Sequence, residues 1–158
     1  MSEPIAADVF AESLFSLLTE TFESSPQPGS IYLDKKAGLF DTLETIDAAQ
    51  ASREVSGTTI AAQVFHTSFY IRALGRYLDG FSGKTDWQES WTTRTVTGEE
   101  WDALRHKLRE DYERAVRKLR AVERWGEDQL DFGMDIVVHS AYHLGAIRQL
   151  AKQVKETA

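Results

Sequence analysis

The chain has 158 residues, of which 42% are hydrophobic and 11% aromatic, enough for one globular domain with a sizeable core over residues 1–158. It contains no cysteine, which excludes a disulfide framework, a thiolate zinc site and a cysteine nucleophile within these residues. The formal net charge of -7 gives no general attraction to nucleic-acid phosphates or anionic lipid, so neither nucleic acid nor a membrane is an expected partner.

The N-terminal stretch MSEPIAADVFAESLF predicts a cytoplasmic rather than an exported protein. It has acidic residues where a signal peptide needs lysine or arginine, and its apolar runs are only a few residues long. Nowhere does the sequence approach the roughly 18 apolar residues that a membrane-spanning helix requires. The absence of cysteine also fits a reducing cytoplasm.

Two amphipathic segments in the first half of the chain predict long helices. Residues 5–23 carry apolar side chains at helical spacing after Pro4, which suits an N-terminal turn. The stretch SSPQPGS at 24–30 predicts a loop, and LFDTLETIDAAQA after it predicts one or two short helical turns. Residues 58–78 predict the second long helix, which Gly80 and Gly83 follow.

The segment between the second and third long helices predicts an ordered crossover. Residues 81–96 are rich in turn formers and have no clear period, and Trp87 and Trp91 are expected to anchor them. TGEE at 97–100 is a capping box that starts the third helix. One face of that helix is apolar, at Trp101, Leu104, Leu108, Tyr112, Ala115, Leu119 and Val122.

The third helix is expected to end near Trp125 and Gly126, and the fourth to run from Asp131 as N-cap to about Val154. Four long amphipathic segments without a convincing strand or internal repeat predict an all-α fold, a four-helix bundle. The long connection between the first two helices and the crossover before the third indicate a topology other than a tight up-down bundle.

Two histidines lie on the core-facing side of the fourth predicted helix, in VVHSAYHLGAIRQL at 137–150. A core histidine bonded through both nitrogens explains one of them, but two on successive turns each need a partner. A shared divalent cation satisfies both, whereas HSAYH lacks the glutamate of the HExxH peptidase motif. At about 100° per residue the following side chains share an arc of roughly 80°: Ile136, His139, His143, Ile147, Leu150 and Val154.

A third ligand could come from His66 or His106. His106 lies in RHKLRE, on the charged side of the third helix, and is expected at the surface. His66 lies on the apolar and aromatic second helix, about 120° from the line through Ile60, Ile71 and Leu78. It therefore either borders the core or lies beside a partner subunit.

Three stretches resemble the DinB-like family, also called the YfiT-like metal-dependent hydrolases: GLFDTLETIDAAQAS at 38–52, TTIAAQVFHTSFYIRAL at 58–74 and HSAYHLGAIRQL at 139–150. The DWQESW segment is similar to some members as well. The resemblance implies a four-helix bundle, often a homodimer, with one histidine of the second helix and two of the fourth on a divalent metal, nickel or zinc. Position by position, the ligands would be His66, His139 and His143.

Two functions follow as hypotheses. Relatives implied by the resemblance include thiol transferases that use bacillithiol, and mycothiol-dependent maleylpyruvate isomerases are similar in fold. The first hypothesis is a metal-dependent enzyme on a small-molecule substrate, a thiol S-transferase or a hydrolase, in which three neutral imidazoles leave an open metal position. Four residues lie near these ligands in the sequence. For each of them three roles are open, namely to orient an imidazole, to contact substrate or to be structural: Tyr70, Asp135, Ser140 and Tyr142.

The second hypothesis is a non-enzymatic, stress-related homodimeric bundle. In it the histidines bind metal for stability, storage or sensing, or form a buried polar cluster without metal. The two hypotheses differ in coordination, because a structural site should be closed by a fourth protein ligand whereas a catalytic site keeps one position open.

Overall fold

The computed structural model describes residues 7–24 and 30–156, and these form an all-helical fold, as the sequence predicts. Pro4 and most of the SSPQPGS stretch lie outside the described residues. None of the described helices is long and apolar enough to cross a membrane. The long helices are α1 (Ala7–Glu23), α4 (Ile60–Leu78), α5 (Gly98–Arg120) and α6 (Glu127–Glu156); the short ones are α2 (Leu39–Glu44), α3 (Ala48–Ser52) and the 3-10 helix η1 (Trp87–Trp91).

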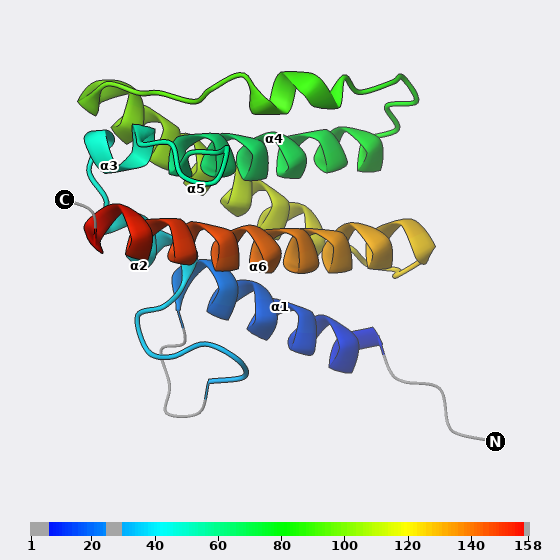
Figure 1. Cartoon of the computed structure of the whole chain (residues 1–158). Helices are drawn as coiled ribbons and strands as arrows, with labels where there is room; N and C mark the ends of the chain where they lie inside the picture. Colours follow the sequence, from blue (N-terminus) through cyan, green and yellow to red (C-terminus); the bar gives the residue numbers. More distant parts are fainter. Residues whose placement is uncertain (1–6, 25–29, 157–158) are drawn as a thin grey trace.

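Helices α4 and α5 run in the same direction, with a long crossover between them (Figure 1). Ser68 donates a 2.6 Å hydrogen bond to Asp111, and farther along both helices the Lys118 ammonium donates to the Gly75 carbonyl oxygen. Consecutive helices can be parallel only if the chain returns along their length, and the segment that contains η1 makes this return. The topology therefore differs from an up-down bundle, as predicted.

Helix α6 lies between α4 and α1 (Figure 1). Two side-chain contacts join α6 to α4, one between Gln63 and His143 and one between His66 and His139. The residue numbers rise along α4 while they fall along α6, so these two helices are antiparallel. On the other side α6 meets α1 where Gly133 faces Leu14. A Cβ atom added at Gly133 would lie 2.5 Å from a Leu14 methyl carbon, so the absence of a side chain there allows the two helices to approach closely.

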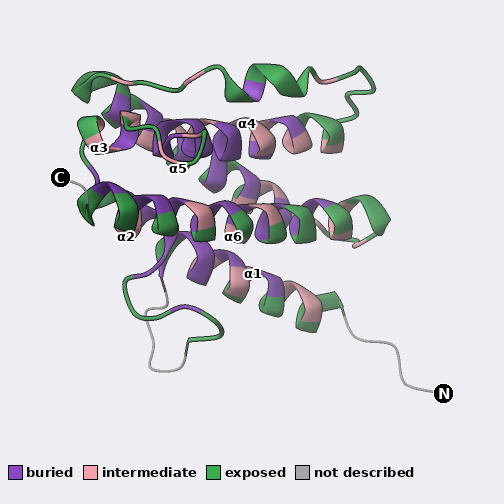
Figure 2. Ribbon diagram, in the orientation of Figure 1, coloured by how far each residue is buried: buried purple, intermediate pink, exposed green. Residues whose placement is uncertain are grey.

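The core lies between the long helices, whose inward faces are buried while the outer faces and the connections are exposed (Figure 2). The α5 residues from Trp101 to Leu119 on the predicted apolar face are all buried. Trp101 also donates its indole N–H to the Ile46 carbonyl oxygen at 2.8 Å, which joins α5 to the segment between α2 and α3. Val122 is only partly buried because it follows the end of the helix.

The capping box at the start of α5 is present as predicted. Thr97 Oγ1 accepts from the Glu100 backbone N–H at 3.2 Å, and the Glu100 carboxylate accepts from the Thr97 backbone N–H at 2.8 Å. The predicted end of this helix near Trp125 was wrong, since α5 ends at Arg120. The backbone N–H of Ala121 bonds the last-turn carbonyl oxygens there and closes the helix.

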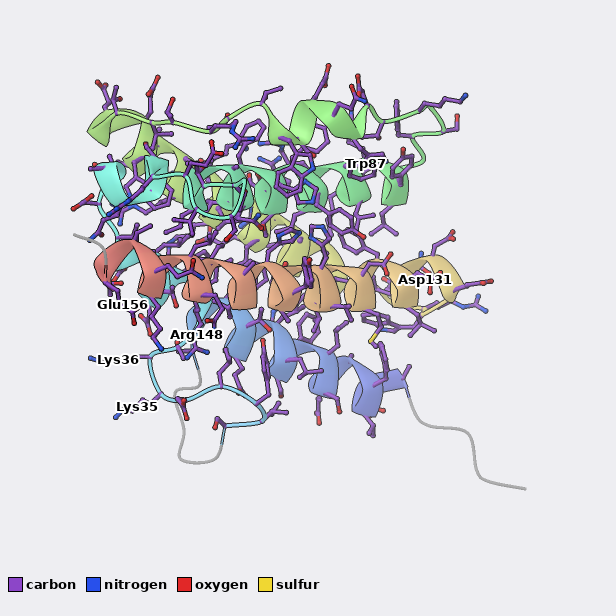
Figure 3. The ribbon with its side chains drawn as sticks, in the orientation of Figure 1. Lys35, Lys36, Trp87, Asp131, Arg148 and Glu156 are labelled. Carbon is purple, nitrogen blue, oxygen red and sulfur yellow. The ribbon has the colours of Figure 1, made fainter. Side chains whose placement is uncertain are left out.

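The predicted start of the fourth helix at Asp131 was also wrong. Helix α6 begins at Glu127, and Asp131 lies inside it, near the right-hand end in Figure 3. The start is defined by Gly126, whose backbone N–H donates to the Gln129 side chain at 3.0 Å. Two carboxylates in the first turn, Glu127 and Asp128, also favour a helix start there through the helix dipole.

A buried carboxylate attaches the described part of the long connection to α1. Glu20, which is 3% exposed, accepts hydrogen bonds from the backbone N–H groups of Ile31, Tyr32 and Leu33 at 2.6, 2.7 and 2.5 Å. Burial alone would raise the pKa of Glu20, but these three donors stabilise the carboxylate and the pKa is lowered. Glu20 is therefore a main attachment of the connection to α1, together with Thr21, whose hydroxyl lies 2.5 Å from the Tyr32 hydroxyl.

Candidate metal centre

Helices α4 and α6 bring His66, His139 and His143 together. One ring nitrogen from each histidine lies within 4.8 Å of the others, and the Nε2 atoms of His66 and His139 are 3.1 Å apart. Two imidazoles on one tetrahedral zinc ion, at about 2.0 to 2.1 Å each, would place their nitrogens roughly 3.3 Å apart. The spacing of this pair therefore fits a shared divalent ion.

The tautomer of His66 follows from its contact with Ser90 of η1. The Ser90 hydroxyl donates its one hydrogen to the Trp87 carbonyl oxygen at 2.6 Å. His66 Nδ1 lies 2.7 Å from that same hydroxyl oxygen, so Nδ1 must carry the proton and donate. The Nε2 atom of His66 is left with a lone pair, which is the form that binds a metal.

The tautomer of His143 follows in the same way from Gln63. Its Nδ1 atom lies 2.6 Å from the Gln63 side-chain oxygen, which can only accept a hydrogen bond. In this orientation the amide NH₂ of Gln63 donates to Thr58 Oγ1 at 3.1 Å. Nδ1 of His143 is therefore the donor, and Nε2 is free to bind metal.

His139 is positioned by stacking rather than by a second hydrogen bond. Its ring lies parallel to that of Tyr70, with centroids 3.5 Å apart and planes 6° apart. Its Nδ1 atom is buried and has no hydrogen-bond partner among the described residues. A buried polar nitrogen without a partner costs stability, and Nε2 is the ring nitrogen of His139 that faces another member of the group.

All three imidazoles are held in the neutral form. Burial lowers the pKa of His66. The pKa of His139 is lowered to about 3, mainly by burial and to a smaller extent by the proximity of the His143 and His66 imidazoles. Burial and the proximity of His66 lower the pKa of His143 to about 4. Because a divalent ion binds neutral imidazole, protons do not compete for this site near neutral pH.

In metal-free protein, the His139 and His143 imidazoles are expected to stay neutral well below the ordinary pKa of 6.5. The unfolded chain takes up protons near pH 6.5 that the folded chain does not, so the free energy of unfolding should fall as the pH decreases from 6.5 toward about 4. Long-range ¹H–¹⁵N spectra of the imidazoles after chelator treatment measure this directly. Titration midpoints near 6.5 for both rings would contradict the burial argument.

Aromatic side chains surround the three histidines. Trp91 of η1 stacks on His66 with ring centroids 3.9 Å apart, and Trp87, labelled in Figure 3, contacts Tyr70 at 5.6 Å. Both tryptophans are 40% exposed and both contact α4 residues, as expected for side chains that anchor the crossover. The crossover thus forms a wall over His66, which explains why a residue off the core line of α4 is only 9% exposed.

The other residues considered from the sequence lie as follows. The His106 side chain is 73% exposed on α5, lies 3.7 Å from Glu110 and does not join the three histidines. Ser140 is fully buried, but its hydroxyl has no hydrogen-bond partner among the described residues and does not hold an imidazole. Asp135 is exposed, and Tyr142, although 73% exposed, presents its ring at right angles to His143 at 5.1 Å.

Two residues that orient the imidazoles, Gln63 and Ser90, were missed from the sequence. Gln63 had a signal, because it is a polar side chain in an apolar run and lies three residues before His66 on the same side of the helix. Ser90 had none, since its role depends on how the crossover folds back over α4.

Comparisons with protein-family models, with curated proteins and with solved structures found no match.

Loss of either orienting side chain is expected to weaken metal binding by about 10 to 100-fold, the usual effect of a group that fixes a ligand's tautomer. Ser90→Ala removes the acceptor for His66, and Gln63→Met removes the acceptor for His143 at similar volume. Competition with a chromophoric chelator measures the affinity. Ser16→Ala, which removes an exposed hydroxyl on α1, is the control, and equal affinities in all three variants would argue against the tautomer assignments.

Proposed function

We propose that this chain is a DinB-like protein that binds one divalent ion, zinc or nickel, through His66, His139 and His143. The observation that carries the proposal is that independent contacts, Ser90 with His66 and Gln63 with His143, place the proton on Nδ1 and so leave a lone pair on Nε2 in two imidazoles of the same group. The contact at Nε2 of His66 is with His139, another of the proposed ligands, and not with a group outside the cluster. The DinB-like type of four-helix bundle is part of the proposal, supported by the parallel α4 and α5 helices and the long connections.

We further propose that the site is catalytic. Among residues 7–24 and 30–156, no aspartate, glutamate or fourth histidine joins the three ligands, so protein groups leave at least one metal position open. A bound divalent ion would supply Lewis acidity, which lowers the pKa of a water or thiol that binds to it. The neutral imidazoles add no negative charge that would reduce this effect.

The chain's own residues would contribute orientation and exclusion of water. Ser90 and Gln63 keep two rings in the metal-binding tautomer, while the stacked rings of Tyr70 and Trp91 fix the planes of His139 and His66. The substrate class that fits this proposal is a small molecule: a low-molecular-weight thiol such as bacillithiol or mycothiol with an electrophile, or a hydrolysable compound. We place the enzyme in the cytoplasm as part of the same proposal.

A homodimer is the proposed assembly. Helix α6 carries an exposed apolar stripe of Met134, Val138 and Tyr142, which are 43%, 63% and 73% exposed. The spacing of four residues places all three on one side of the helix, next to the histidines. Sedimentation velocity of the wild type and Val138→Glu tests this, with a dimer expected for the first and a monomer for the second.

A non-enzymatic metal-binding bundle is the alternative, and one observation favours it. Trp91 and Tyr70 stack directly on two of the three imidazoles, which restricts the directions from which a substrate could approach. In this alternative the ion stabilises the α4 and α6 packing or is stored or sensed.

The enzyme proposal is tested by assaying zinc-loaded and nickel-loaded protein with bacillithiol, mycothiol and glutathione against a panel of electrophiles, together with ester and amide hydrolase substrates. The expected result is turnover with at least one pair and none in His143→Ala prepared in parallel. If metal-loaded wild type is inactive in every assay while the metal remains bound, the result favours the non-enzymatic alternative.

A further inference from the structure

A cavity separate from the histidines lies between α4 and α5. It has a volume of about 350 Å³, within the range of roughly 300 to 1,000 Å³ typical of small-molecule sites. Phe69 of α4, Ala115 of α5 and Phe132 of α6 form apolar parts of its wall, and Glu89 of η1 is at its border. None of the three histidines lines it.

The cavity is rich in cationic side chains, although the chain as a whole has a net charge of -7. Four basic residues line it, against three acidic ones, so its charge differs in sign from that of the protein. The basic residues are Arg72, Arg76, Arg114 and Lys118; the acidic ones are Asp79, Glu89 and Asp111.

The carboxylates do not neutralise every cation in the cavity. Asp111 is already bonded by Ser68 at 2.6 Å, by Lys107 at 2.9 Å and by Arg72 at 3.3 Å. Arg114 lies only 3.9 Å from the same carboxylate, beyond hydrogen-bond distance, and its side chain is 54% exposed. Its guanidinium therefore retains donors for another partner.

Arg76 is the second cation with free donor capacity. Its contacts are a 3.4 Å hydrogen bond to Thr85 and the face of the Phe81 ring, 4.8 Å from the guanidinium carbon. Within the described part of the chain, no carboxylate lies within 4.0 Å of it. A planar guanidinium in this state can bind a carboxylate or phosphate through two parallel hydrogen bonds.

Gly75 keeps part of the cavity open. A Cβ atom added at Gly75 would meet no atom within 4 Å, and the residue lines the cavity in the interior of α4. A side chain at this position would therefore extend into open space and not into a neighbouring helix.

We propose that this cavity binds a small organic anion, with its carboxylate or phosphate group on Arg76 and Arg114 and its apolar body against Phe69, Ala115 and Phe132. The proposal does not depend on the metal centre. Mixed apolar and cationic walls would select against both inorganic anions, which lack the body, and neutral aromatic compounds, which lack the charge.

The test is a titration of the full chain, followed by ¹H–¹⁵N NMR, with phenyl phosphate, benzoate and the neutral benzamide. Saturable shifts at the backbone amides of α4 and α5 near Gly75 and Ala115 are expected with at least one anion and not with benzamide. The anion with the lower dissociation constant shows whether the site prefers phosphate or carboxylate. Saturable binding in His143→Ala, which lacks a proposed metal ligand, shows that this site is separate from the metal centre.

Variants of the chain make the test specific. Gly75→Phe should fill the cavity and abolish binding, while Arg114→Gln should weaken it about tenfold through loss of a charge-assisted hydrogen bond. Arg148→Gln on exposed α6 surface is the control and should bind like the wild type (Figure 3). Because Arg114 is largely exposed, its variant tests the site even if Gly75→Phe does not fold. The proposal is wrong if neither anion saturates, if benzamide binds equally well, or if Arg114→Gln has no effect.

Discussion

Replacing His143 by alanine is expected to weaken zinc or nickel binding by roughly a hundredfold or more. The reason is that each of the few imidazole ligands contributes a large part of the binding free energy. His143 is 4% exposed and its Nδ1 is held by Gln63, and among the described residues no aspartate, glutamate or other histidine joins the group to replace it. Metal analysis after reconstitution and gel filtration, with competition titrations for the affinity, measures the effect.

Two further variants make this result interpretable. His139 is only partly buried, so His139→Ala should lose metal with less effect on packing than His143→Ala. His106→Ala removes an exposed histidine of α5 and should retain the wild-type metal content. Circular dichroism shows whether each variant is folded. Equal metal content in the wild type and all three variants would mean that these histidines form only a buried polar cluster.

Replacing Glu20 by alanine is expected to lower the free energy of unfolding by roughly 3 kcal/mol or more, because hydrogen bonds to charged groups contribute about 1.5 to 3 kcal/mol each and three backbone donors would lose their acceptor. Glu20→Gln keeps one side-chain oxygen without the charge and should have an intermediate effect. Urea unfolding followed by circular dichroism measures both variants.

The pH dependence of the Glu20 contribution has a definite sign. Its pKa is lowered in the folded chain from the ordinary value of 4.5, so the stabilisation is present above pH 4.5 and is lost as the pH falls below it. The difference in stability between the wild type and Glu20→Gln should therefore shrink in acid. Glu12→Ala on the exposed side of α1 is the control, and an equally small loss in both alanine variants would contradict the anchoring role.

Much of the fold could be predicted because it depends on local rules. Helical spacing of apolar residues located the long helices, and the Thr97 capping box located the start of α5 to the residue. The errors concerned helix ends where competing signals are close together. Asp131 is a good N-cap residue, but Gly126 and the acidic residues Glu127 and Asp128 come before it in the chain. The helix begins at the first position where its backbone N–H donors are satisfied.

The candidate site was only partly predictable for a different reason. His139 and His143 share one helix, so their common direction follows from helix geometry alone. His66 lies off the core line of its helix, and only the resemblance included it. What buries His66 is η1, a segment without periodicity, whose Trp91 covers the ring and whose Ser90 sets its tautomer. Such contacts between distant segments leave no pattern in the sequence.

The central claim, that three imidazoles bind one divalent ion, is tested most directly by X-ray absorption spectroscopy of the zinc-loaded wild type. The account predicts one zinc per chain with three nitrogen ligands at about 2.0 to 2.1 Å, the multiple-scattering pattern of imidazole, and at least one non-imidazole light-atom ligand. A spectrum without imidazole scattering, or a chain that takes up no zinc or nickel, would contradict it.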